Sequence, residues 1–391
     1  MIHASSSSAV VPSLKPLTLR DCKLERNNSG NILSGSVDGI ELYFKTGAQQ
    51  ELVYSAEPFI AAMLMPAMLR GCDIAIPKEF AVSAKFVAGI DTLQSIFLLW
   101  YPQLKRINIE ARTGDTPLRS QQPGCALFFS GGLDASYGLL KNERIVTHLV
   151  YVRGIDMQLG DDALYGQCLA ANQQIADKFN KSLVPIETNV RFFIRQLGGG
   201  DLGWSKSQGC GLGSVALALG FPNILISSSN TYENLHPCGS HLLTDPLCSN
   251  DLVTIIHDGC EARRHEKLLL VSKNEFLLQR VRVCWQDKGL NCGKCDKCLH
   301  FRMALTLCDL HISNFAPLTD YSELSGAHVN TPGEYVEWED NLVLARNMGN
   351  KLAYKAIYKL LQRYNFKQIV KLSDRVFFKG KLSAAKTRLL S

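Results

Sequence analysis

A glycine turn directly after an apolar segment is the clearest indication of phosphate chemistry in this sequence. The turn, Ser130–Ser136 (SGGLDAS), follows the apolar run Cys125–Phe129 (CALFF). A short apolar run bounded by turn signals is typical of a buried parallel strand, so the segment predicts a strand, a tight turn and a helix. Adjacent glycines let backbone N–H groups approach an anion, and the start of a helix favours phosphate. The hydroxyls of Ser130 and Ser136 add donors, and Asp134 is suited to position Mg²⁺ beside a polyphosphate.

This turn resembles the pyrophosphate loop (PP-loop) of the N-type ATP pyrophosphatases, which include asparagine synthetase, GMP synthetase, tRNA-thiolating enzymes and 7-cyano-7-deazaguanine synthase. A P-loop is excluded because no Gly-Lys-Ser/Thr follows the glycines, and an ordinary strand-to-helix turn is the alternative. The resemblance implies an adenine nucleotide α-hydrolase-like fold that cleaves ATP between its α and β phosphates. The family usually has Ser directly after the Asp, whereas this chain has Ala135. The ATP-binding residues that the resemblance implies are Ser130, Gly131, Gly132, Leu133, Asp134 and Ser136.

Four cysteines, Cys284, Cys292, Cys295 and Cys298, form the strongest local pattern. Two Cys-x-x-Cys steps, with Gly293 in the first, predict a tight knuckle, and Cys284 can close a tetrahedral Cys₄ site of the structural zinc type. An iron–sulfur cluster is the alternative, because the tight spacing also suits one, and it would favour a thiolation enzyme. Within the superfamily, 7-cyano-7-deazaguanine synthase is similar in having a Cys…Cys-Gly-x-Cys-x-x-Cys zinc site near its C-terminal end.

Residues next to the cysteines extend this prediction. Lys294 and Lys297 are expected to offset the negative charge of a zinc tetrathiolate. Leu299, Met303 and Leu307 recur at helical spacing, so the site is expected to attach a helix to the body of the protein.

Two further segments supply candidate catalytic and substrate-binding groups. Ser240, His241 and Asp245 lie in a loop rich in turn formers, which is expected to follow the carboxyl end of a strand, where substrates are bound. His241 is expected to hold a carboxylate or to move a proton, with a loop-capping role as the alternative. Arg264 or Lys267 is expected to stabilise the charge that builds on the α-phosphate during adenylation, with a solvated helix face as the alternative.

The order of strand and helix patterns indicates the fold class. From residue 125 onward the two patterns alternate, which predicts an α/β, doubly wound, mainly parallel sheet with ligands at the carboxyl ends of its strands. The expected strands are Ala126–Phe129, Thr147–Val152, Ser182–Glu187, Ile224–Ser227 and Leu252–Ile256, with helices between them at Ser136–Leu140, Asp162–Asn180, Val190–Leu197 and Gly213–Leu219.

The remaining segments are organised around this unit. Residues 17–112 combine alternating strand-like segments with two helix-like segments and predict a small α+β domain. The complete expected order is a disordered N-terminus at 1–16, this α+β domain, a linker at 113–124, a PP-loop domain with the Cys₄ site at 125–310, and a helical basic C-terminal extension at 311–391.

The composition is that of a globular protein. The 391 residues are 46% hydrophobic and 20% charged, which is ordinary for a soluble chain long enough for two domains. No apolar run approaches the roughly 20 residues of a membrane span, and no secretory signal is present, so a cytoplasmic location is expected. The 13 cysteines, an odd number, then favour reduced thiols with a metal-binding subset over a disulfide framework.

The net charge of +6 is unevenly distributed along the chain. Residues 341–391 contain twelve Lys and Arg and one acid, Asp374, for +11, so the rest carries −5. On a helix, basic residues at every fourth position would form a stripe suited to an acidic partner, namely a carrier protein, nucleic acid or anionic lipid; the alternative is a solvated face. The stripe comprises Lys351, Lys355, Lys359, Arg363, Lys367, Lys371, Arg375 and Lys379.

The resemblance and the motifs together predict an ATP-dependent ligase with ATP, Mg²⁺ and structural Zn²⁺ as cofactors. It would adenylate a small-molecule carboxylic acid, release pyrophosphate and join the acid to ammonia or an amine as an amide or nitrile. The alternatives are a PP-loop sulfur transferase, possibly acting on tRNA, and a non-catalytic ATP-binding module in which Ala135 reflects lost turnover. No built-in glutaminase is expected, because Met1 is not followed by the Cys of the glutamine-dependent members. The acid and the nucleophile stay open, and an oligomer is compatible with the sequence.

Overall fold

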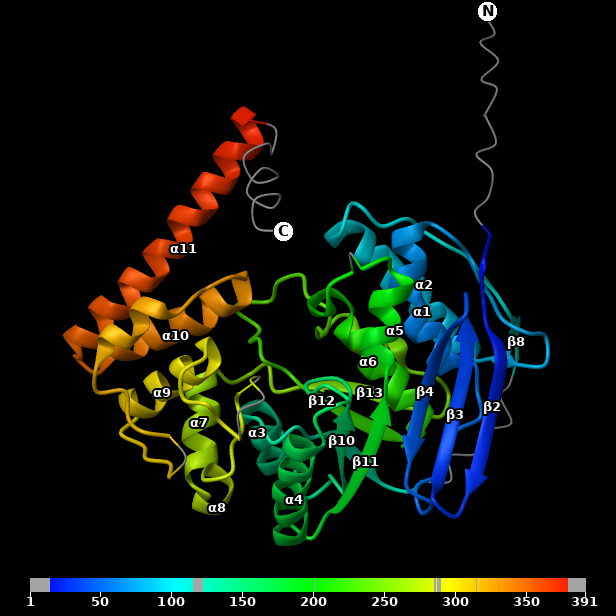
Figure 1. Ribbon diagram of the computed structural model, residues 1–391, viewed down its shortest axis with the longest axis horizontal. Helices are drawn as coiled ribbons and strands as arrows, with labels where there is room; N and C mark the ends of the chain where they lie inside the picture. Colours follow the sequence, from blue (N-terminus) through cyan, green and yellow to red (C-terminus); the bar gives the residue numbers. More distant parts are fainter. Residues whose placement is uncertain are drawn as a thin grey trace, which may run out of the picture.

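The protein is a mixed α/β structure built on one large sheet. The computed structural model describes residues 15–114, 122–200, 202–284, 286, 290–313 and 315–378. The sheet has eight strands (Figure 1). In chain order they are β2 (Arg20–Asn27), β3 (Gly30–Val37), β4 (Ile40–Thr46), β9 (Cys125–Phe128), β10 (His148–Arg153), β11 (Ser182–Thr188), β12 (Asn223–Ser227) and β13 (Thr254–Asp258).

The order of the strands across the sheet is β13-β12-β9-β10-β11-β4-β3-β2. All pairs from β13 to β11 are parallel, whereas β11 with β4, β4 with β3 and β3 with β2 are antiparallel. The prediction of an α/β fold with a mainly parallel sheet is therefore confirmed. Two small sheets lie outside it, formed by β1 (Leu17–Thr18), β5 (Ile74–Ala75) and β7 (Ile109–Glu110), and by β6 (Ala81–Val82) and β8 (Arg112–Thr113).

Helices cover both faces of the sheet. Successive side chains of a strand point to opposite faces. Accordingly, Ala126 and Phe128 of β9 join one apolar core while Cys125 and Leu127 join another. The first core also receives α1 (Glu57–Arg70), α2 (Ala84–Trp100), α5 (Val190–Leu197) and α6 (Trp204–Leu219), and the second receives α3 (Leu133–Lys141), α4 (Asp162–Lys178), α7 (Arg264–Ser272), α8 (Glu275–Leu278) and α9 (Asp296–Leu307).

Two local predictions were wrong. The helix predicted to begin at Gly213 begins at Trp204, so Gly209 and Gly211 lie inside it rather than before it. A close approach of the backbone explains why a glycine stands at position 209 within the helix. The Gly209 N–H donates to the carbonyl of Gly239 at 2.8 Å, and a Cβ there would lie 2.3 Å from that oxygen. Strand β3 was not predicted from the sequence, because its two glycines and two serines weaken the apolar pattern of a strand that is largely buried.

Residues from the two predicted domains contribute to the same sheet. β4 pairs with β11, with Thr46 opposite Ile186, and α1 packs against α5 and α6. The division of the chain into domains stays a prediction. Residues 1–14 of the predicted disordered segment, 115–121 of the predicted linker and 379–391 of the predicted extension lie outside the described residues.

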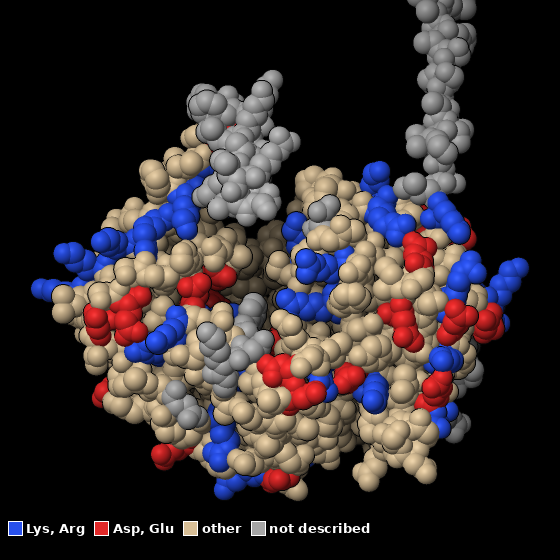
Figure 2. Space-filling view, viewed as in Figure 1, with Lys and Arg blue, Asp and Glu red and all other residues tan. Residues whose placement is uncertain are grey.

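The C-terminal part is helical, with α10 (Pro332–Asn347) and α11 (Lys351–Phe378). Ile357 and Leu361 of α11 are buried in a core shared with α9 and α10, whereas Phe366 and Ile369 are 67% and 62% exposed. Figure 1 shows α11 projecting away from the sheet, and Figure 2 shows Lys and Arg side chains along it. Arg363 of the predicted basic stripe is half-buried, and its guanidinium donates hydrogen bonds to the carbonyls of Leu324 and Ser325. None of the helices within the described ranges has the length and apolarity that crossing a bilayer requires.

Candidate active site

The predicted phosphate turn connects β9 to α3. Gly131 has φ of +78°, a conformation that favours glycine, and its carbonyl accepts a hydrogen bond from the N–H of Arg282 at 2.8 Å. A Cβ at Gly131 would lie 2.9 Å from an oxygen of Asn172. The N–H of Gly132 donates to Ser130 Oγ at 3.3 Å, and α3 begins directly after Gly132. The strand, turn and helix predicted from this segment are thus present.

The turn opens onto a cavity of about 300 Å³ at the carboxyl ends of β9 and β12. Ser136 does not line this cavity; it is fully buried, and its Oγ has no hydrogen-bond partner among the described residues. Gly131 does not line the cavity either; its carbonyl accepts the hydrogen bond from the N–H of Arg282. The turn residues that do line the cavity are Ser130, Gly132, Leu133, Asp134 and Ala135.

The rest of the cavity wall divides into an apolar and a polar group. The apolar group includes Val150, Val152, Ile155, Met157, Trp204, Leu212 and Ile226. The polar group contains four uncharged side chains, Gln208, Ser227, Ser229 and Ser240. It also contains one histidine and five charged side chains, namely His257, Asp156, Arg264, Arg282, Lys297 and Glu337.

Arg264 and Lys267 of α7 both reach the carboxylate of Asp134, a contact that was not predicted from the sequence. Arg264 Nη1 is 3.1 Å from Oδ2, and Lys267 Nζ is 3.1 Å from Oδ1. Lys267 is 1% exposed and also donates to the carbonyl of Ser228 at 2.5 Å. Burial alone would raise the pKa of Asp134, but the charges of Lys267 and Arg264 outweigh it and lower that pKa. Asp134 is therefore a carboxylate whose two oxygens each contact a cation.

Helix α10 completes this charged wall. Glu337 accepts from Arg264 Nη1 at 3.2 Å. Burial raises the pKa of Glu337, but the charge of Arg264, with smaller effects from His300 and Lys297, outweighs burial and lowers it. Arg264 thus joins a carboxylate of the phosphate turn to one of α10, while its Nε is buried with no hydrogen-bond partner among the described residues.

A second buried cluster lies behind the opposite wall. The side chain of Asp245 is fully buried and accepts hydrogen bonds from Ser240 Oγ at 2.6 Å and from the N–H of His241 at 3.1 Å. Its Oδ2 is 2.8 Å from His257 Nδ1. Burial lowers the pKa of His257, but hydrogen bonds to Asp245 and Cys260 outweigh it and raise the pKa to about 9. His257 is therefore an imidazolium at neutral pH.

The predicted substrate-binding residues are only partly at the cavity. Ser240 lines it, whereas Asp245 lies behind Ser240 and His257. His241 does not line it; its ring packs against Trp100 at 4.9 Å, and its Nδ1 accepts from the N–H of Leu243 at 3.0 Å. Burial, with a smaller effect from the charge of His257, lowers the pKa of His241.

Several cavity residues had no site role in the sequence-based prediction, among them His257, Arg282 and Lys297. His257 is the residue before the last of β13, and its position near the carboxyl end of a parallel strand is a signal that could have identified it. Arg282 precedes Cys284 by two residues and carries no local signal. Lys297, expected only to offset thiolate charge, also lines the cavity.

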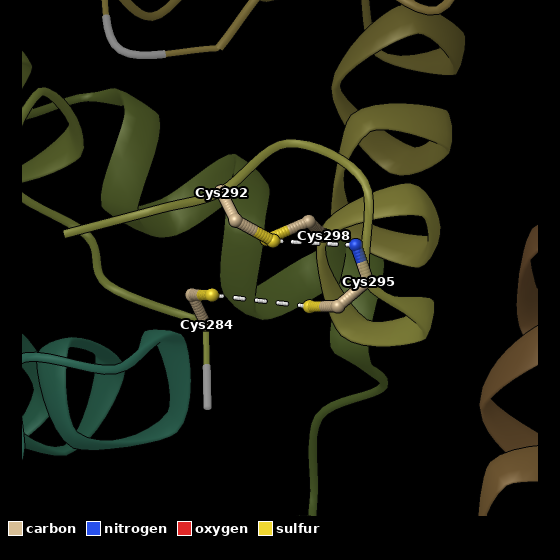
Figure 3. Close-up of side chains that lie close together, drawn as sticks. All are labelled: Cys284, Cys292, Cys295 and Cys298. Atoms are coloured by element: carbon tan, nitrogen blue, oxygen red, sulfur yellow. Dashed lines mark hydrogen bonds between the residues drawn. The ribbon is translucent and has the colours of Figure 1, made fainter. Parts of the chain in front are cut away.

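The four predicted metal ligands come together beside the cavity (Figure 3). Their Sγ atoms all lie within 4.8 Å of one another, with Cys284 to Cys295 at 3.9 Å and Cys292 to Cys298 at 3.8 Å. A tetrahedral zinc ion with Zn–S bonds of about 2.3 Å places its sulfurs about 3.8 Å apart, so the cysteines fit such an ion. Hydrogen bonding from Cys298 lowers the pKa of Cys295 to about 5, which provides a thiolate for a metal.

The arrangement combines backbone donors at a helix start, cations and an apolar wall, which together suit a nucleotide. The Cys₄ cluster, with no open ligand position, suits a structural metal such as zinc. Comparison with protein-family models, curated proteins and solved structures produced no match to the chain.

Proposed function

We propose that this chain is an ATP-dependent ligase of the N-type ATP pyrophosphatase kind, which adenylates a carboxylic acid and joins it to ammonia or an amine. The observation that carries the proposal is the cavity at the Ser130–Ser136 turn. Had the turn packed against protein, it would leave no place for phosphates. Its opening beside Arg264, Arg282 and Lys297 instead provides space and positive charge for a polyphosphate.

The topology supports a doubly wound nucleotide fold. From β9 the chain adds β10 and β11 on one side, then returns to place β12 and β13 on the other side of β9. The direction of winding therefore reverses between β9 and β12. In open α/β sheets, ligands bind in the crevice at such a switch point. The cavity lies there, lined by the turn after β9 and by Ser227 and Ser229 at the end of β12.

The cavity wall suggests how ATP would lie. The phosphates would occupy the N-terminal end of α3, where backbone N–H groups and the helix dipole favour an anion. Asp134 would hold the Mg²⁺ that accompanies them. The base would occupy the apolar wall formed by Val152 of β10 and by Ile155 and Met157, which come shortly after this strand.

In the proposed reaction, a carboxylate oxygen attacks the α-phosphorus and pyrophosphate leaves. Ammonia or an amine then adds to the carbonyl carbon, loses a proton and expels AMP, giving an amide. When ammonia is the nucleophile, a second ATP can adenylate the oxygen of the primary amide with release of pyrophosphate, and elimination of AMP with loss of the two N–H protons gives a nitrile. Arg264 lies beside Asp134 and would stabilise the charge that develops on the α-phosphate. His257, an imidazolium beside Ser240, takes the carboxylate-holding role that the sequence predicted for His241.

A pyrophosphate-release assay tests this function. The full chain is supplied with Mg·ATP, ammonium and a panel of carboxylic acids. Release that requires an acid and is lost in Asp134→Asn supports the ligase. Tight ATP binding without release under every condition would instead identify a non-catalytic ATP-binding module.

Sulfur transfer is the second candidate, and Cys260 favours it. The thiol lies just after β13, and burial raises its pKa, but hydrogen bonds to His257 and Ser228 outweigh burial and lower it. A low thiol pKa favours the thiolate that sulfur chemistry uses. In that case the exposed lysines of α11 would bind the phosphate groups of a tRNA backbone. Cys260→Ala distinguishes the candidates, because amide formation should survive the substitution and sulfur transfer should not.

A further inference from the structure

The cysteine cluster and the cavity share two cationic residues. Arg282 lies two residues before Cys284, and Lys297 lies between Cys295 and Cys298. Both line the cavity that contains the phosphate turn. The segment that a metal would organise therefore also supplies two of the cavity's cations.

The backbone around Arg282 is fixed on two sides. Its N–H donates to the carbonyl of Gly131 at 2.8 Å, which joins it to the phosphate turn. The side chain of Asn291 accepts from the N–H of Val283 at 2.9 Å and donates to the carbonyl of Val281 at 3.0 Å. Because Asn291 directly precedes the Cys-x-x-Cys knuckle, these bonds tie the Arg282 segment to the cysteine site as well.

Arg282 has hydrogen-bonding capacity that the described residues do not use. Its Nε and Nη2 atoms are buried and have no hydrogen-bond partner among them. Leaving buried charged donors unsatisfied is costly, and the guanidinium fork matches phosphate oxygens. Since Asp156 and Glu337 also line the cavity, a polyphosphate that carries a divalent cation suits the mixture of charges better than a bare anion does.

We infer that the metal site has a functional role besides its structural one. It positions Arg282 and Lys297 beside the glycine turn, where they bind the terminal phosphates of Mg·ATP. The inference rests on the proposed ATP site and adds which residues take the phosphates and what positions them. It makes metal occupancy and nucleotide affinity interdependent. Because coupling between two bound ligands is reciprocal, bound nucleotide must strengthen metal retention by the same factor.

Calorimetric titration of zinc-loaded full chain with Mg·ATP tests the phosphate contacts. Arg282→Gln and Lys297→Gln should each weaken binding, the former by about 10- to 100-fold, because charge-assisted hydrogen bonds are lost. The matched controls are Arg280→Gln, which removes a guanidinium that stacks on Phe276 outside the cavity, and Lys273→Gln, which removes an exposed lysine that does not line the cavity and lies directly after α7. Zinc content and the melting temperature are measured for every variant.

The outcomes separate the two proposals. Wild-type protein that fails to bind Mg·ATP overturns the proposed function and this inference together. Wild-type protein that binds Mg·ATP, with Arg282→Gln binding equally well, overturns only this inference. Weaker binding by Arg282→Gln and Lys297→Gln at unchanged zinc content and melting temperature, with both controls like wild type, supports it.

Equilibrium competition for zinc tests the coupling itself, without any turnover. The chain is equilibrated with a chelator of known zinc affinity, with and without Mg·ATP, and the zinc retained by the protein is measured. Mg·ATP should increase the amount of zinc that the wild type retains and should have little effect on the amount that Arg282→Gln retains. The variant also serves as the control for zinc that ATP binds in solution. Equal retention by the wild type under both conditions, despite nucleotide binding, would overturn the coupling.

Discussion

Arg264 Nη1 lies 3.1 Å from Asp134 Oδ2, so the first residue of α7 holds the carboxylate of the phosphate turn. The two residues are separated by 130 positions in the sequence but meet at the edge of one cavity. Because Glu337 accepts from the same Nη1 atom, the arginine also connects the turn to α10. The position of Asp134 therefore depends on three elements that are distant in sequence.

Arg264→Gln should lower pyrophosphate release about 100-fold or more, because charge stabilisation of the transition state is lost. It should also lower the free energy of unfolding by about 2 kcal/mol, since charge-assisted hydrogen bonds to two carboxylates are removed. Urea unfolding and the release assay measure both effects. Arg263→Gln is the matched control, because Arg263 contacts the exposed Glu233 and should contribute little. Equal activity of the two variants would contradict the role of Arg264.

The His257–Asp245 pair predicts a loss of stability at alkaline pH. The pKa of His257 is raised from 6.5 to about 9 in the folded protein, so its stabilising contribution is complete below pH 6.5 and is lost as pH rises toward 9. The contribution amounts to at most about 3 kcal/mol. Urea unfolding at several values between pH 6 and 9.5 measures it.

His257→Gln provides the control for this prediction. The variant should be less stable than the wild type at pH 6, and the difference should shrink as pH rises to 9.5. His148→Gln removes a half-buried histidine that has no carboxylate partner among the described residues; because burial lowers the pKa of His148, the variant should leave the slope above about pH 7.5 unchanged. A wild-type minus His257→Gln difference that is constant with pH would show that folding does not raise the pKa of His257, and would contradict the prediction.

The features that were predictable from the sequence are local ones. The turn after Cys125–Phe129 is identified by two glycines after an apolar run, and the Cys₄ site by the spacing of its cysteines. The position of His257 near a strand end was a usable signal, but the absence of His241 from the cavity lining could not be predicted, because it depends on a loop that places His241 against Trp100. The cavity position of Arg282 likewise follows from a backbone hydrogen bond to a turn about 150 residues earlier.

Metal analysis of purified protein should find one zinc per chain and no acid-labile sulfide. Four sulfurs within 4.8 Å suit a single ion, whereas an iron–sulfur cluster distributes its cysteines over several irons. Cys292→Ser should lose the metal and lower the melting temperature, because structural zinc binding contributes folding free energy. Cys308→Ser, which changes a half-buried cysteine outside the site, should retain the metal. Stoichiometric iron with sulfide would favour the sulfur-transfer candidate.

Ala135→Ser should strengthen Mg·ATP binding, because it restores the hydroxyl that the resembling family usually carries after the Asp of this turn. Ala135 lines the cavity and is 6% exposed, so the added oxygen would face the ligand site. One further hydrogen bond to phosphate predicts an affinity gain of about 2- to 10-fold, which calorimetry can resolve. Ala262→Ser is the matched control, since Ala262 is 8% exposed and does not line the cavity. If Ala135→Ser weakens binding while the control does not, the chain has adapted this position to a ligand that leaves no room for a hydroxyl, and the ATP assignment of the turn would lose its support.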